Sequence, residues 1–114
     1  MIKDTNELIL KLLLLLAFAD KVYMEEEKEL VNRISSELGV SKEKLSEVVS
    51  EVEKTDDITK QCRDTANQIQ DKRDREKTIK LLSEMITSDK IVHKAEIFAL
   101  QIIAEEWNMF IDKN

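Results

Sequence analysis

Proline is absent from this chain of 114 residues, and Gly39 is its only glycine. β-Sandwiches and barrels need many tight turns, which depend on Gly, Pro, Asn and Asp for their backbone angles. Phosphate-binding loops likewise need several glycines close together. Because the chain is instead rich in helix-favouring Leu, Ile, Glu, Lys and Ala, we expect an all-α protein. The length fits one self-sufficient core, so a single domain is expected over residues 1–114.

Apolar periodicity and helix-capping residues predict a compact bundle of about six helices. Gly39 is expected to end the second helix in a left-handed conformation, and Ser41 to cap the third. Residues 54–75 fit either one helix or two. The expected bounds are residues 4–19, 25–38, 41–53, 58–70, 76–87 and 94–107.

The first helix contains an almost continuous apolar run from Leu8 to Ala19. This run is shorter than the ~20 residues needed to span a bilayer. It is also interrupted by Lys11 and preceded by the acidic Asp4 and Glu7, unlike a signal peptide. We therefore expect a helix buried on most sides, no membrane insertion and a cytoplasmic location.

The formal net charge is −6, which disfavours nucleic acid as a partner because its phosphates would be repelled. Residues 60–80 are an exception, since basic side chains outnumber acidic ones there. This stretch is interpreted as a solvated helix face, with docking of an acidic partner as the alternative.

Two segments of the chain repeat with an offset of 69 residues. Each contains an aspartate, then a lysine, then a branched apolar residue, and a glutamate seven positions after the aspartate. The acidic members are Asp20 and Glu27 in the first copy, and Asp89 and Glu96 in the second. Each copy is predicted to form a helix, a short acidic loop and a second helix.

The two hairpins would belong to repeat halves of about residues 5–53 and 76–111. Packed around a pseudo-twofold axis, they would build the bundle. If the axis brings the loops together, Asp20, Glu27, Asp89 and Glu96 would offer carboxylate oxygens to calcium or magnesium.

Helix geometry offers an alternative explanation for the same four residues. At the third position of a helix, Glu27 and Glu96 can bind free backbone amides and favour the helix dipole. Asp20 and Asp89 can accept hydrogen bonds from amides of their own loops. The sequence leaves both interpretations open.

No catalytic pattern is visible, so we expect a non-enzymatic protein, with a carboxylate-only hydrolase as the alternative. The single histidine, His93, leaves little scope for acid–base chemistry near neutral pH. It is interpreted as a solvated loop residue, with a metal ligand or pH switch as the alternative. The single cysteine, Cys62, cannot form an internal disulfide and is expected in the core rather than as a nucleophile.

The last helix is expected to bury an apolar side made of Ala95, Phe98, Ala99, Ile102, Ile103 and Trp107. A minority interpretation is an exposed apolar patch used for oligomerisation. It would draw on Tyr23, Phe98, Trp107, Met109 and Phe110.

Around the repeat the sequence resembles the TerB-like family, that is, tellurite resistance protein B and the N-terminal domain of some membrane-anchored DnaJ-type co-chaperones. The resemblance covers roughly residues 8–109. It rests on Ala17-x-Ala19-Asp20-x-Val22-Tyr23-x-x-x-Glu27, on Ser88-Asp89-x-Ile91-Val92-x-x-x-Glu96, and on Leu38-Gly39-Val40-Ser41.

The resemblance implies an all-helical bundle with acidic residues at two loops, an association with tellurite and stress resistance, and binding of divalent cations. The implied site residues are Asp20, Glu27, Asp89 and Glu96. Lys21 and Lys90 stand where the family commonly has glycine, and their ammonium groups would oppose cation binding.

The sequence therefore predicts a small TerB-like module that binds a divalent cation at two acidic loops. The alternative is a protein–protein interaction or oligomerisation domain without metal, in which the acidic residues serve as helix caps. An unidentified protein partner is expected in either case, and the sequence specifies no oligomeric state.

Overall fold

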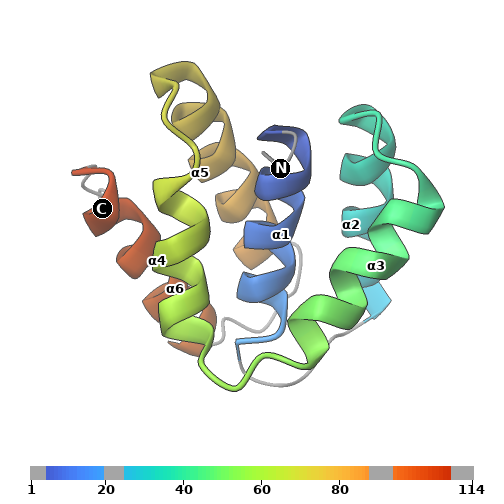
Figure 1. The fold of residues 1–114 in the computed structure, drawn as a ribbon, viewed down its shortest axis with the longest axis horizontal. Coiled ribbons are helices and arrows are strands. Elements are labelled where there is room, and N and C mark those ends of the chain that lie inside the picture. The colour runs from blue at the N-terminus through green and yellow to red at the C-terminus, as the bar shows by residue number, and fades with distance from the viewer. Residues whose placement is uncertain (1–4, 20–24, 88–93, 109–114) are drawn as a thin grey trace.

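The computed structural model describes residues 5–19, 25–87 and 94–108, and these form a bundle of α-helices without any strand (Figure 1). The all-α bundle predicted from the sequence is confirmed. No helix among the described residues is long and apolar enough to cross a membrane. The six helices are α1 (Thr5–Ala17), α2 (Glu25–Glu37), α3 (Lys42–Glu53), α4 (Ile58–Asn67), α5 (Lys72–Thr87) and α6 (Lys94–Glu106).

Helix α1 is the centre of the bundle, and each of the other five helices packs against it. In Figure 1, α2 and α3 lie on one side of α1, and α4, α5 and α6 lie on the other. Every residue from Leu8 to Ala17 is buried. Because burying one leucine side chain stabilises a fold by about 1.5–3 kcal/mol, this run dominates the core. The expected helix buried on most sides is confirmed.

One charged side chain interrupts the buried surface of α1. The Lys11 Nζ lies 2.8 Å from Glu51 Oε1 on α3, and 9% of the lysine side chain is exposed against 44% of the glutamate side chain. The lysine stem lies along the apolar surface while its ammonium group reaches a partly solvated carboxylate. The ion pair thereby makes a lysine tolerable within the otherwise apolar buried run of α1.

The connection between α2 and α3 follows local capping rules. Gly39 has φ of 74°, the left-handed conformation expected where α2 ends. The Val40 amide donates to the Ser35 carbonyl at 2.9 Å, which closes the cap. The Ser41 side chain accepts a hydrogen bond from the Lys44 amide at 3.1 Å, so both predicted caps are confirmed.

The segment 54–75 contains one helix, α4, and the start of a second, α5, which settles the alternative left open by the sequence. α4 ends at Asn67, three residues before the predicted end, and α5 begins at Lys72, four residues before the predicted start. The earlier start of α5 comes from Asp71, whose side chain accepts from the Arg73 amide at 2.8 Å. A local cap thus begins this helix in a charged segment that has no apolar periodicity.

The predicted solvated basic face holds for most of its residues but not for Arg75. Lys72, Arg73 and Lys77 are exposed. Arg75 is half-buried, because its Nε donates to the Ile69 carbonyl at 2.7 Å. Its guanidinium also lies 5.6 Å from the centre of the Trp107 ring. Arg75 therefore ties the first turn of α5 to the segment between α4 and α5 and to the residue that follows α6.

Candidate metal centre

Helices α2 and α6 occupy corresponding positions in the two copies of the sequence repeat. Each has 13 residues, and both their starts and their ends are separated by the offset of 69 found in the sequence. They begin at Glu25 and Lys94, so Glu27 and Glu96 fall at the predicted third helical position. The pseudo-twofold relation between the copies stays a prediction.

Glu27 and Glu96 are almost completely buried, with exposed fractions of 1% and 2%. Neither carboxylate is without an interaction partner. Glu25, two residues before Glu27 on the same helix, is different: its side chain is 81% exposed and pairs with Lys28 at 3.3 Å. Burial therefore distinguishes the repeated glutamates from a neighbouring acidic residue at the same helix start.

The energetic cost of this burial is larger than a helix end repays. Transferring a carboxylate out of water costs several kcal/mol even after the surroundings relax. The dipole at a helix N-terminus returns about 0.3–1 kcal/mol at the surface and up to ~2 kcal/mol when partly buried. Each buried glutamate therefore requires stronger compensation than the helix dipole alone.

The other two predicted site residues, Asp20 and Asp89, lie outside the described residues, as do Lys21, Lys90 and His93. In Figure 1 the starts of α2 and α6 both lie in the lower half of the view, on opposite sides of α1. Within the described ranges, no group of three or more His, Cys, Asp or Glu side chains could hold a metal ion. Further carboxylate ligands for a site that uses Glu27 or Glu96 would therefore come from residues outside those ranges, such as Asp20 and Asp89.

The thiol of Cys62 is not a reactive group in the folded protein. The side chain is fully buried on α4, and desolvation raises the pKa of the thiol to about 12. The protonated thiol is a poor nucleophile and a poor metal ligand at neutral pH. The prediction of a core cysteine is confirmed.

The prediction that Phe98 belongs to the buried side of α6 is wrong, because this side chain is 58% exposed. Ala95 is only half-buried, whereas Ala99, Ile103 and Trp107 are buried as expected. Helical spacing places Phe98 on one stripe with Ile102, but it does not show how far the neighbouring helix reaches. Within the proposed oligomerisation patch, Tyr23, Met109 and Phe110 lie outside the described residues.

The structure therefore defines a small all-α module with a central apolar helix and a buried glutamate at each of two corresponding helix starts. The chain belongs to the tellurite resistance protein TerB family, whose sequence model matches residues 6–109. The resemblance noted from the repeat is thereby confirmed. Searches of the curated proteins and of the solved structures give no match to this chain.

Proposed function

We propose that this chain is a non-enzymatic, cytoplasmic TerB module that binds a divalent cation, calcium or magnesium, through its two acidic loops. Asp20 and Glu27 would provide oxygen ligands at one loop, and Asp89 and Glu96 at the other. The family name associates such a module with tellurite resistance, and we propose a role in that stress response.

The observation that carries the proposal is the burial of Glu27 and Glu96 at corresponding helix starts. Carboxylate oxygens are the ligands that calcium and magnesium prefer, and a bound cation offsets the desolvation of a carboxylate far better than a helix dipole does. Exposed capping glutamates would gain the dipole energy without this cost. Both glutamates also have partners within the fold, so their burial supports cation binding without excluding capping.

The affinity is expected to be weak. Lys21 and Lys90 are adjacent in sequence to Asp20 and Asp89, and their positive charges oppose a cation nearby. We expect dissociation constants of about 10⁻⁴ to 10⁻³ M, the range of the weaker protein calcium sites.

The test is a calcium and magnesium titration followed by amide chemical shifts and by thermal unfolding. The wild type is compared with the double variant Glu27→Gln and Glu96→Gln. The matched control is Glu29→Gln with Glu105→Gln, because both of these glutamates are exposed and lie on the same two helices. A second variant, Asp20→Asn with Asp89→Asn, removes the other two proposed ligands.

The proposal expects saturable shifts next to both loops and a higher melting temperature with cation, each lost in both site variants and kept in the control. The capping alternative expects no saturable shift up to several millimolar cation. It also expects Glu27→Gln with Glu96→Gln to change the melting temperature equally in chelator and in calcium. That second result would refute cation binding.

A link to tellurite resistance is tested separately in a tellurite-sensitive bacterial host. Expression of the wild type is expected to raise the tolerated tellurite concentration, and expression of the site variants is not. Equal tolerance with and without the protein would refute that part of the proposal.

A further inference from the structure

Helices α4 and α6 run side by side and in the same direction, and they are fastened together at their C-terminal ends. The Trp107 Nε1 donates to the Ala66 carbonyl at 2.8 Å in a buried hydrogen bond. Next to it, the Asn67 Nδ2 donates to Glu106 Oε1, also at 2.8 Å. These two contacts fix the spacing of the helices at one end.

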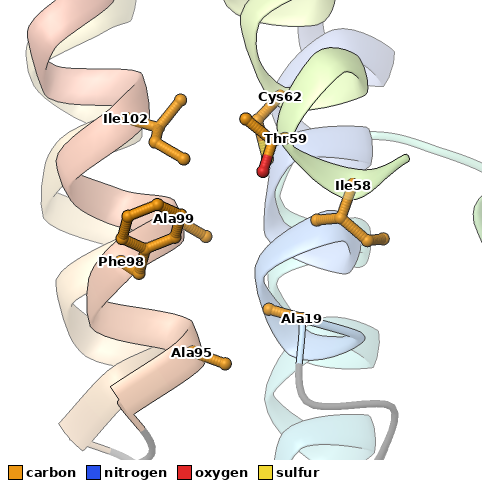
Figure 2. A pocket seen from close by; sticks show the side chains of 8 residues that line it. All are labelled: Ala19, Ile58, Thr59, Cys62, Ala95, Phe98, Ala99 and Ile102. Atoms are coloured by element: carbon orange, nitrogen blue, oxygen red, sulfur yellow. The ribbon is translucent and has the colours of Figure 1, made fainter.

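At their N-terminal ends the same helices line an open apolar pocket of about 90 Å³ beside the end of α1 (Figure 2). Cys62 on α4 and Ala95 and Ala99 on α6 are small, so their side chains leave part of the space between the two helices unfilled. Figure 2 shows the α6 side chains on one side and the α4 side chains on the other, with Ala19 of the α1 end below those of α4. The pocket is bounded by Ala19, Ile58, Cys62, Ala95, Phe98 and Ile102.

Ile58 also lines a second, open depression next to this pocket. This depression is bounded by Phe18, Val52 and the turn between α3 and α4. Ile58 lines both, and Phe18 is followed directly by Ala19 of the pocket. We name the combined surface the α1-end groove.

The only charged side chains that line the described α1-end groove are Glu53 and Asp56. Both are exposed at its rim. The groove thus combines an apolar floor with a negatively charged rim. Such a surface is complementary to a segment that carries apolar side chains on one face and basic side chains beside them.

A second copy of this chain fits the groove poorly. A twofold contact would bring the two copies of Glu53 and Asp56 near one another, and each chain has a net charge of −6. Among the described residues, the exposed large apolar side chains are Ile97 and Phe98. They supply far less than the ~800 Å² per partner that a stable interface buries. A short segment of another protein is a better occupant.

We propose that the α1-end groove docks a basic amphipathic helix of a partner protein. One aliphatic side chain of that helix enters the pocket between α4 and α6, which is smaller than the ~150 Å³ cavity that holds benzene and is therefore too small for an aromatic ring. Phe98 covers the apolar face of the helix, and its lysine or arginine side chains meet Glu53 and Asp56. The argument for this docking does not rest on the proposed cation binding.

The test uses the full chain in chelator, so that its result does not depend on the proposed cation sites. The probe is a synthetic 18-residue helical peptide with leucine on one face and lysine on the other. A second peptide has glutamate in place of every lysine. Amide chemical shifts locate the contact, and the titration gives its affinity.

Three sets of variants separate the contributions to binding. Ala95→Leu fills the pocket at a half-buried position, and Phe98→Ala removes an exposed ring, so both variants should keep the fold. Glu53→Gln with Asp56→Asn removes the acidic rim. Its matched control is Glu43→Gln with Asp64→Asn, two exposed carboxylates that do not line the groove.

We expect the lysine peptide to shift amides around the groove. Affinity should fall at least tenfold for Ala95→Leu and at least fivefold for Phe98→Ala and for the rim variant, with no change for the control. The proposal is overturned if the glutamate peptide binds equally well, if the shifts lie elsewhere, or if the control loses as much as the rim variant. It is also overturned if amides near Phe98 shift with protein concentration alone, which would identify a second copy as the occupant.

Discussion

Thr65 and Thr78 are two fully buried threonines that differ in one respect. The Thr78 hydroxyl donates to the Asp74 carbonyl at 2.6 Å. The Thr65 hydroxyl has no hydrogen-bond partner among the described residues. Valine has nearly the same shape as threonine and the same branching at Cβ, so Thr→Val tests the hydroxyl with little change in packing. We predict that the two substitutions change stability in opposite directions.

The expected magnitudes follow from the hydrogen bonds. A buried hydroxyl without a partner costs about 1–3 kcal/mol, so Thr65→Val should raise the free energy of unfolding by about that amount. Thr78→Val removes a made hydrogen bond and should lower it by about 1 kcal/mol. The two variants should therefore differ by about 2–4 kcal/mol, or roughly 8 °C or more in melting temperature for a domain of this size.

The assay is urea and thermal unfolding followed by circular dichroism at 222 nm on the wild type and both variants. Equal slopes against urea would show that the compactness of the unfolded state is unchanged. If Thr65→Val destabilises the protein as much as Thr78→Val, the reasoning is refuted. The Thr65 hydroxyl would then have a partner, such as a bound water.

Three other substitutions follow from described contacts. Glu51→Ala leaves the Lys11 ammonium largely buried without its carboxylate. Because Glu51 is partly exposed, the free energy of unfolding measured in urea titrations should fall by only about 1–2 kcal/mol. Gly39→Ala places a Cβ in the left-handed region, where no atom lies within 4 Å, so only the conformational cost of about 1 kcal/mol should appear in the melting curve. Burial raises the pKa of the Cys62 thiol from 9.0 to about 12. The contribution of this protonated thiol to the free energy of unfolding should therefore be fully present below pH 9 and be lost as the pH rises from 9 to 12. Cys62→Ala should flatten this alkaline loss, and an unchanged slope would show that other groups cause it.

Local signals in the sequence were sufficient for most of the helices. Gly39 and Ser41 were predictable because a left-handed cap and an N-cap depend on one residue and its neighbours. The burial of Leu8–Ala17 was predictable because only a helix covered on most sides accommodates such a run. The start of α5 was predicted four residues too late. The helix begins with a charged turn capped by Asp71, and that turn has no apolar periodicity from which a helix could be predicted.

Features that depend on distant partners could not be read from the chain. Phe98 has the spacing of a core residue, but its burial depends on how closely α4 approaches α6. Arg75 has the sequence context of a solvated residue, yet Ile69 and Trp107 engage it in the fold. The repeat correctly placed Glu27 and Glu96 at the third helical position, whereas their burial is a property of the packed bundle.

The central position of α1 has a consequence during protein synthesis. α1 leaves the ribosome before the five helices that cover it, and its ten buried residues have no complete covering until α6 has followed. At translation rates of about 5–20 residues per second, that interval is roughly 5–20 s. During this time the apolar surface of α1 is exposed on the nascent chain, and a chaperone that binds it would prevent aggregation most effectively in this interval.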